Sequence, residues 1–352
     1  MLRVLPKSTR SATYYVRDQA LELEGVREGA AAYWLRGSGV IDDQVLESIW
    51  PQPPRSKTLG YDLVFAAPRP YSILLATAKI DEQRQTIALH RDAVRSAMNY
   101  LEERALVIRA SIEGESVELS ARWNQALAFT HGVNRGGEPH LHDHVLVAAV
   151  PAHRRRALDS RALRMHAVAA DAIYRAELRM GLTNTQQRVA WRTFAGHELV
   201  QGIDEGLRGL WPGERVYGAE KIHWTREGIL EKWSRDMAHF EALYEHRVPL
   251  RSRDHVDEQV FSAHFEGQST VSRSDLITAT ANAAVFGADR WSIEQFVDTN
   301  YPELANQRGS LERRISIVDA RQHSQIRSHG PRELGMTRTH QRDLPRSIER
   351  SR

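Results

Sequence analysis

The fold and the chemistry of this chain are both indicated by one segment, Phe129-Thr-His131-Gly-Val-Asn-Arg135-Gly-Gly-Glu-Pro139-His140-Leu-His142-Asp-His144. A run rich in valine and alanine follows it directly. Apolar residues on both sides of a Gly-Gly turn predict two neighbouring antiparallel strands. Because side chains alternate between the two faces of a strand, His142 and His144 share one face. His131, on the preceding strand, completes a set of three imidazoles.

Three histidines in this arrangement indicate a metal site. Neutral imidazole is a common protein metal ligand, and three of them leave coordination positions open for a substrate. His140 would share the face of His142 and His144 if the strand began early. Pro139 argues for a later start, because proline lacks a ladder donor and usually lies at a strand start or edge. We therefore predict His131, His142 and His144 as ligands of a divalent ion and leave His140 out. An all-nitrogen set does not distinguish Mg, Mn and Zn.

Length and composition are those of a soluble globular protein with a full core: 352 residues, 41% hydrophobic and 26% charged. No segment approaches the ~18 apolar residues of a membrane span, so no membrane insertion is expected. The N-terminus lacks the hydrophobic core of a signal peptide, and we expect a cytoplasmic protein. Cysteine is absent, which excludes disulfides, thiolate zinc sites and cysteine nucleophiles.

The basic residues are clustered, although the formal net charge is only +3. The sequence pI is about 9.2, and basic residues recur near the C-terminus. Such runs suit a phosphate backbone, and they are equally typical of a solvated surface or a disordered tail. Our candidates for phosphate contacts are Arg69, Arg135, Arg154, Arg155 and Arg156.

Hydrophobic periodicity along the chain predicts an α+β domain, with a central antiparallel sheet and helices packed on one face. The predicted strands cover 1–5, 61–68, 106–112, 116–120, 123–130 and 141–150. The predicted helices cover 71–105, 164–181, 225–246 and 273–286. From about residue 305 the chain is charged and polar, which predicts a disordered tail.

Two further features have chemical potential. Asp62 lies near the start of an otherwise apolar strand, where a buried carboxylate needs a partner. It would accept the second N–H of a metal-bound histidine or a proton from a nucleophile, unless it is a solvent-exposed strand end. Tyr14 and Tyr15 lie at a predicted helix start and point about 100° apart, so that one packs while the other faces a cleft. A pair of core aromatic residues is the alternative. A tyrosine hydroxyl becomes a competent nucleophile beside a polarised phosphate and a base.

Taken together, these motifs resemble those of the MobF-class (TrwC/TraI-like) relaxases of the HUH endonuclease superfamily. Tyr14-Tyr15 matches the tyrosine pair near the family's N-terminus. The segment Asp62-Leu-Val-Phe-Ala-Ala-Pro68 matches a strand that reads Asp-Leu-Thr-Phe-Ser-Ala-Pro. The histidines match Phe-Thr-His and Pro-x-Leu-His-x-His. The motifs occur in the family's order, and the agreement runs with gaps from residue 1 to about 245.

The resemblance implies a palm-like relaxase domain over 1–245, a helical connector over 246–304 and a basic tail over 305–352. It implies that a divalent ion on the three histidines polarises a phosphate of single-stranded DNA. Tyr14 or Tyr15 would attack that phosphate and leave a 5′-phosphotyrosyl enzyme and a free 3′-OH. Asp62 would orient a histidine or assist deprotonation.

The resemblance also implies a substrate and partners. The substrate is single-stranded or hairpin DNA at an origin of transfer, nicked during conjugative mobilisation. Accessory relaxosome proteins and a type IV secretion coupling protein are the implied partners.

Several departures from the family pattern matter for the predicted activity. Family members commonly carry a second tyrosine pair, but residues 20–25 contain no tyrosine, which puts in doubt a two-tyrosine strand exchange by one chain. Arg69-Pro70-Tyr71 replaces Lys-Ser-Val, and Ala149 replaces an asparagine; neither change removes a ligand. No Gly-x-x-x-x-Gly-Lys-Ser/Thr occurs, so no nucleotide cofactor is expected. Two other hypotheses are a DNA-binding remnant that does not nick and a different histidine–metal hydrolase whose tyrosines are structural.

Overall fold

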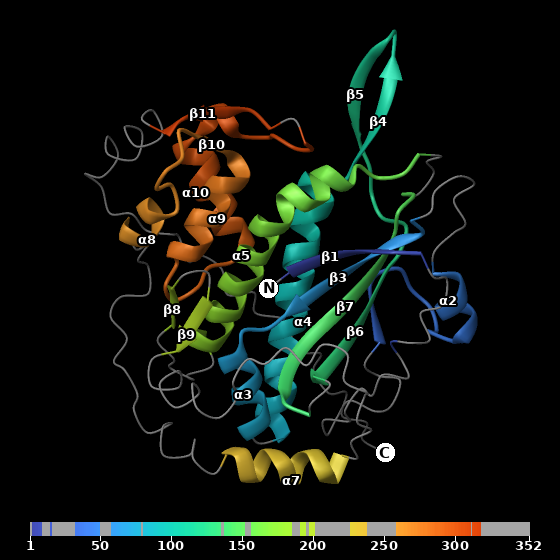
Figure 1. The fold of residues 1–352 in the computed structure, drawn as a ribbon, viewed down its shortest axis with the longest axis vertical. Helices are drawn as coiled ribbons and strands as arrows, with labels where there is room; N and C mark the ends of the chain where they lie inside the picture. The colour runs from blue at the N-terminus through green and yellow to red at the C-terminus, as the bar shows by residue number, and fades with distance from the viewer. Residues whose placement is uncertain are drawn as a thin grey trace, which may run out of the picture.

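A five-stranded antiparallel sheet forms the centre of the computed structural model, with strand order β1-β3-β7-β6-β2 (Figure 1). The strands are β1 (Leu2–Lys7), β2 (Ala32–Arg36), β3 (Gly60–Ala66), β6 (Ala126–Val133) and β7 (Pro139–Ala148). The structure describes residues 2–8, 15, 32–49, 58–78, 80–134, 137–151, 156–184, 191–194, 197–200, 226–237, 258–310 and 312–317. The predicted helix start near Ser11 lies outside these ranges, apart from residue 15.

One face of the sheet packs on two long helices, α4 (Ile80–Arg104) and α5 (Ser160–Asn184). Alternation along β3 and β7 directs apolar side chains to this face, and they are fully buried: Leu63, Phe65, Leu141, Val145 and Val147. The large core between the sheet and these helices fixes the register of every central strand, because a slip of one residue would expose it.

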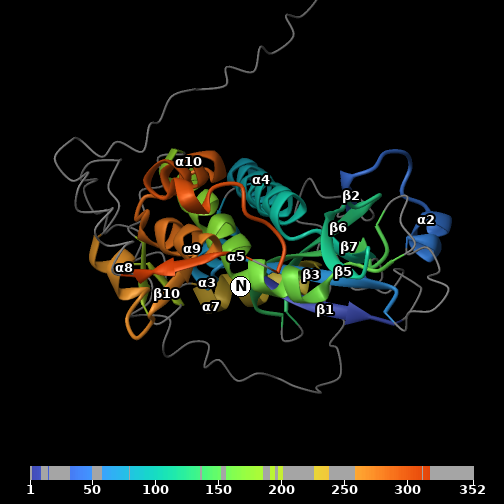
Figure 2. The ribbon, with the colours of Figure 1, turned by 90° about the horizontal axis from the view of Figure 1, so that it is seen from above.

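The opposite face of the sheet has a smaller apolar cluster. Helix α2 (Asp43–Ser48) is capped by Asp42, whose side chain accepts the backbone N–H of Val45. Leu46 of this helix and Ile49 directly after it pack with Tyr15 and with Leu127, Phe129, Leu146 and Ala148 of the sheet. Figure 2 shows the sheet between α2 on one side and α4 with α5 on the other. The predicted α+β fold with an antiparallel sheet is therefore confirmed, although α2 shows that the helices are not confined to one face.

Residues 258–317 form a third layer on the outer side of α5 (Figure 2). It contains α8 (Glu258–Ala263), β10 (Thr270–Ser272), α9 (Arg273–Ala283), α10 (Arg290–Asn300), the short 3-10 helix η2 (Pro302–Leu304) and β11 (Arg314–Ser316). The Arg179 side chain of α5 is buried and donates to backbone carbonyls at the end of α9, including that of Ala284 at 3.1 Å. Gly287 has φ +84°, and a Cβ there would lie 2.0 Å from the backbone nitrogen of Met180.

The start of the predicted tail at residue 305 is too early. Strand β11 pairs with β10, and Ser310 is buried with its hydroxyl and amide on Glu118. Local composition suggested disorder, but these residues are ordered by contacts with distant parts of the chain. Residues 318–352 lie outside the described part, so the tail prediction stands untested there. The proposed division at 245 likewise falls outside it.

The remaining elements flank the sheet. The predicted hairpin is present as β4 (Val107–Ile112) and β5 (Glu115–Ser120), which project from the body in Figure 1. Its turn residues Glu113 and Gly114 both have positive φ, as a two-residue hairpin turn requires. The single helix predicted over 71–105 is two helices, α3 (Arg69–Thr77) and α4, separated at Ala78, where the backbone is extended.

A second short hairpin, β8 (Trp191–Phe194) and β9 (His197–Val200), follows α5. Helix α7 (Arg226–Met237) lies against α3, and the indole of Trp233 donates to the carbonyl of Gly137 in the β6–β7 turn. Within the described residues, every helix is too short or too polar to cross a bilayer.

Candidate metal centre

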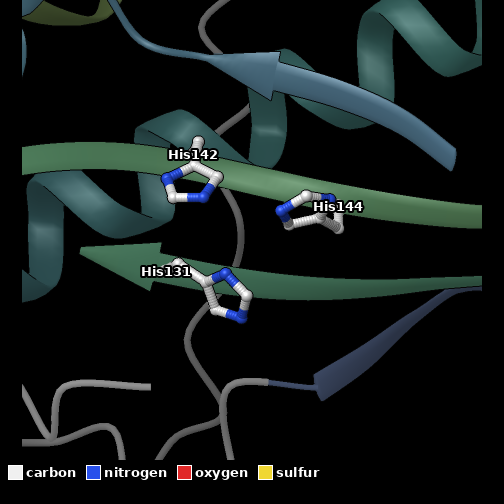
Figure 3. Close-up of side chains that lie close together, drawn as sticks. All are labelled: His131, His142 and His144. Atoms are coloured by element: carbon white, nitrogen blue, oxygen red, sulfur yellow. The ribbon is translucent and has the colours of Figure 1, made fainter. Parts of the chain in front are cut away.

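Three histidines meet on the face of the sheet opposite α4 and α5. His131 of β6 and His142 of β7 are directly paired across the strands, and His144 lies two residues further along β7. Each offers a ring nitrogen, and these atoms all lie within 4.8 Å of one another. Figure 3 shows the three rings turned toward a common point between the strands. The structure thus brings together the three predicted ligands, called here the histidine triad.

Hydrogen bonds orient each ring of the histidine triad. The Nδ1 atom of His144 lies 2.9 Å from a carboxylate oxygen of Asp62, and Nδ1 of His142 lies 2.7 Å from the carbonyl of His140. The Nε2 atom of His131 lies 3.1 Å from the carbonyl of Tyr15. An imidazole that donates from one nitrogen presents a lone pair on the other. The nitrogens left for a cation are therefore Nε2 of His142 and His144 and Nδ1 of His131.

The triad also favours the neutral form that a metal requires. Burial, together with repulsion from His144, lowers the pKa of His131 to about 4. Burial and the surrounding histidines lower the pKa of His142 well below its usual value. Both imidazoles are therefore unprotonated near neutral pH, and their ring nitrogens are available as lone-pair donors.

His140 lies beside the triad but is not part of it. Strand β7 begins at Pro139, so His140 does share the strand face with His142, and the argument that Pro139 delays the strand is wrong. Proline fits there because it is the first residue of the strand. The His140 ring lies 4.6 Å from that of His142. Its nitrogens are not within the group of three close atoms found among the described residues.

Asp62 connects the triad to a tyrosine. Its carboxylate is fully buried, accepts the Tyr15 hydroxyl at 2.7 Å and contacts His144. Lys7 of β1 forms an ion pair with it at 3.0 Å. Burial alone would raise the pKa of Asp62, but His144, the Tyr15 hydroxyl and Lys7 together hold it below its ordinary value. Asp62 is thus an ionised acceptor shared by a histidine, a tyrosine and a lysine.

Tyr15 is packed firmly beside the triad. Its ring stacks on Phe129 with a centroid separation of 5.5 Å and tilts against His144 at 4.9 Å. The ammonium of Lys7 lies 5.3 Å from the centre of the same ring. Only 4% of Tyr15 is exposed. Tyr14, the other predicted nucleophile, lies outside the described residues.

The structure describes two of the five predicted phosphate contacts, Arg69 and Arg156, and they lie on different elements. Arg69 is half-buried at the start of α3, where burial lowers its pKa while the charge of Glu138 opposes that change. Arg156 is exposed and donates to the carbonyl of Arg109 in β4. This contact lies near the C-terminal end of β7, whereas His142 lies near its start. Arg135, Arg154 and Arg155 lie outside the described residues.

Two charged residues near the triad were not predicted from the sequence. One is Lys7: Leu5 of β1 is paired with Asp62, and alternation along β1 places Lys7 on the same face as Leu5. Asp143 was also missed; it is fully buried on the other face, between His142 and His144. The signal for Asp143 was a lone acidic residue at a core position between Leu141 and Val145.

Comparison with known proteins agrees with this geometry. The model of the TrwC relaxase family matches residues 8–211, which is more than half of the chain. This chain belongs to the TrwC relaxase family. The matched region contains the tyrosine pair, Asp62 and the three histidines that led to the predicted resemblance.

Relatives of this TrwC-family chain include two proteins from Escherichia coli, one of them from strain K12. Both are named multifunctional conjugation protein TraI. Each is 36% identical over 95 residues, which cover 27% of this chain and 5% of the relative. The match therefore spans a small part of the TraI proteins.

Solved structures with the same fold include the conjugative relaxase TrwC in complex with oriT DNA in a copper-bound form. Its TM-score is 0.54 at 20% identity, over 68% of this chain and 99% of that one. A TrwC complex with a 27-mer DNA that comprises the recognition hairpin and the cleavage site has a TM-score of 0.52 at 19% identity, with the same coverage. At these identities the likeness establishes that the fold is shared.

Proposed function

We propose that this chain is a metal-dependent relaxase that nicks one DNA strand at a specific site through a tyrosine–phosphodiester intermediate. The observation that carries the proposal is the chain of contacts from the Tyr15 hydroxyl through Asp62 to His144 of the histidine triad. It joins a potential nucleophile, a proton acceptor and a candidate metal ligand within one contiguous group of side chains. Membership of the TrwC relaxase family supports the same reaction.

The residues present fit a divalent cation. The triad offers three nitrogen donors, and the second nitrogen of each ring faces an acceptor that fixes its orientation. Three donors leave positions for phosphate oxygens, and the all-nitrogen set suits first-row ions such as Zn or Mn. When bound, the ion would supply Lewis acidity to the scissile phosphate.

The protein's own groups would then carry the covalent step. A tyrosine oxygen bonds to phosphorus while the bond from phosphorus to the 3′ oxygen breaks. The tyrosine proton passes to Asp62 or to water, and the 3′ oxygen leaves as a hydroxyl after taking up a proton. The products are a 5′-phosphotyrosine and a free 3′-OH. One ester replaces another, so the reverse attack by the 3′-OH reseals the strand.

The two tyrosines would have different tasks. The Tyr15 hydroxyl points at Asp62, which is the contact a proton acceptor for a tyrosine nucleophile requires. Its ring is also buried against Phe129 and His144, which suits an anchoring role. Tyr14 is the second candidate for the attack. Separate substitutions at the two positions distinguish these roles.

We propose single-stranded or hairpin DNA at an origin of transfer as the substrate. One TrwC structure of the same fold is a complex with oriT DNA, and another is a complex with a 27-mer DNA that comprises the recognition hairpin and the cleavage site. Arg69, Arg135 and Arg154 to Arg156 are our candidates for phosphate contacts. Accessory relaxosome proteins, a type IV coupling protein and a cytoplasmic site of action complete the proposal.

A cleavage assay on the full chain tests this function. An oligonucleotide that carries the cognate site is incubated with Mn²⁺ and resolved on a denaturing gel, for the wild type and for Tyr14→Phe, Tyr15→Phe and His142→Ala. Tyr100→Phe is a matched control, because it removes a buried hydroxyl from α4, on the other side of the sheet. We expect a covalent protein–DNA adduct that is lost in one tyrosine variant and in His142→Ala but retained in the control.

Other outcomes contradict the proposal. Metal-dependent cleavage without an adduct would indicate a hydrolase with structural tyrosines. DNA binding without cleavage would indicate a remnant that has lost its activity. An adduct that survives both in His142→Ala and after removal of metal would contradict the role assigned to the histidine triad.

A further inference from the structure

Strand β7 carries an acidic side chain on the face opposite the histidine triad. Asp143 lies between His142 and His144, and alternation directs its carboxylate into the core beneath α4 and α5. It has no exposed surface, and its neighbours on that face, Leu141 and Val145, are apolar. A carboxylate in such a place is costly unless it is paired, so its partners indicate what it is held against.

Two side chains from different elements hold the Asp143 carboxylate. The Tyr33 hydroxyl of β2 donates to Oδ2, and the Nε2 atom of His90 in α4 lies 3.0 Å from Oδ1. Among the described residues neither Nε2 of His90 nor Oδ1 of Asp143 makes an aligned hydrogen bond, so the close approach of the two atoms is the one polar contact of each. Both contacts are made by side-chain groups that can carry a hydrogen, so donor groups from two different elements face the carboxylate oxygens.

Further contacts fix these two partners in turn. The Tyr174 hydroxyl of α5 lies 2.8 Å from Nδ1 of His90, and the two rings meet edge to face. A neutral His90 satisfies both contacts, because Nδ1 accepts from the tyrosine while Nε2–H faces the carboxylate. The guanidinium of Arg91 lies 4.7 Å from the centre of the Tyr33 ring.

Arg91 also reaches the strand next to β7. Its Nε donates at 3.1 Å to the hydroxyl of Thr130, the residue of β6 directly paired with Asp143. Side chains from β2 and α4 thus contact the one residue of β7 that separates two of the triad histidines, and side chains from α5 and β6 contact the surrounding residues.

We propose that Asp143 is a positioning residue for the histidine triad: it fixes the spacing of the two histidines on either side of it and places a carboxylate behind the site. The inference rests on the proposed metal site, because it concerns how that site is held. Asp143 lies on the other face of β7 and does not contact the triad rings in the way that Asp62 does.

Asp143 lies directly behind the triad, because His131 of β6 is paired with His142 of β7 and Thr130 is paired with Asp143. A cation at the triad would be stabilised by the carboxylates of Asp143 and Asp62, one on each face of the sheet. The loss of outer partners that touch metal ligands commonly costs 10–100-fold in metal affinity. For a residue one step further away, we expect about tenfold, the low end of that range.

The test is Co²⁺ binding to the full 352-residue chain, since its visible absorption reports coordination geometry as well as affinity. Asp143→Asn keeps the shape of the side chain and removes its charge. The matched control is Glu177→Gln, the same carboxyl-to-amide change at a buried site of α5 whose partners are Ser96 and the backbone of Arg290. We expect Asp143→Asn to weaken Co²⁺ binding about tenfold and to regain DNA cleavage at saturating metal. Glu177→Gln should bind Co²⁺ like the wild type.

A purely structural role would give a different result. It would lower the thermal stability of metal-free Asp143→Asn and leave its Co²⁺ affinity equal to that of the wild type and of Glu177→Gln, and this outcome overturns the inference. If Asp143→Asn does not fold, Tyr33→Phe and His90→Gln carry the test. Each removes one partner of the carboxylate and should weaken Co²⁺ binding and alter its spectrum. Wild-type binding in both of these variants also overturns the inference.

The failure of the proposed function is distinguishable from the failure of this inference. If the wild type and His142→Ala bind Co²⁺ equally, the metal site itself is wrong and the role of Asp143 is refuted with it. If His142→Ala loses binding while Asp143→Asn does not, the metal site stands and only the positioning role is refuted.

Discussion

Asp62→Asn should lower both the stability of the fold and the affinity of the candidate metal site. In the native protein the carboxylate accepts the Tyr15 hydroxyl at 2.7 Å, contacts His144 Nδ1 at 2.9 Å and pairs with Lys7 at 3.0 Å. The amide keeps one acceptor oxygen but loses the charge, and its NH₂ group faces donors. A hydrogen bond to a charged group contributes about 1.5–3 kcal/mol. With one such bond lost and an amide facing donors, we expect about 2–4 kcal/mol lower stability at neutral pH.

The same substitution should weaken metal binding. Asp62 fixes the tautomer of His144 that leaves Nε2 for the cation, and loss of such partners costs about 10–100-fold in affinity. The measurement is a metal titration of Asp62→Asn beside oligonucleotide cleavage. Asp92→Asn on α4 is the control, because that carboxylate is exposed and pairs with Arg95 on the helix surface. The reasoning is refuted if Asp62→Asn matches this control in stability, metal affinity and cleavage.

The effect of Asp62 on stability has a defined pH dependence. Because the folded-state pKa is lowered, the folded protein holds this proton less tightly than the unfolded chain does. The stabilisation is therefore fully present above the unfolded pKa of about 4 and is lost as the pH falls through the folded value. Urea unfolding at about pH 7 should separate wild type from Asp62→Asn, and the two should converge in acid.

Three further substitutions test the packing around the site. Gly287→Ala should cost about 2–4 kcal/mol in urea unfolding, because φ is +84° and the new Cβ would meet the Met180 backbone. Burial raises the pKa of Glu177 from 4.5 to about 7, so the wild type should lose up to about 3 kcal/mol between about pH 4.5 and pH 7. Glu177→Gln should show no such slope in the same titration. Phe129→Ala should cost about 3–5 kcal/mol and also weaken metal binding, because its ring supports Tyr15; unchanged affinity would contradict that support.

Local patterns were sufficient to predict that the three histidines of the candidate site lie close together. The period of two in a strand is a backbone property, so the shared face of His142 and His144 followed from their spacing. The missing N–H of proline was a poorer guide to where the strand starts. The first residue of a strand can lack a ladder donor, and β7 begins at Pro139 itself. The boundary at residue 305 also failed, because composition reports local tendency while Ser310 is ordered by Glu118 of the distant hairpin.

The sequence by itself determined the chemical types and their order: a tyrosine pair, an aspartate in an apolar strand, and three histidines around a turn. These depend on residue identity and on short-range periodicity, which one chain displays directly. Only the tertiary structure decided that Asp62 would meet Tyr15, His144 and Lys7, and that Asp143 would meet His90 and Tyr33. Those contacts join segments far apart in the chain, and they arise from strand order and from helix packing against the sheet. A single sequence carries no spacing rule for such contacts.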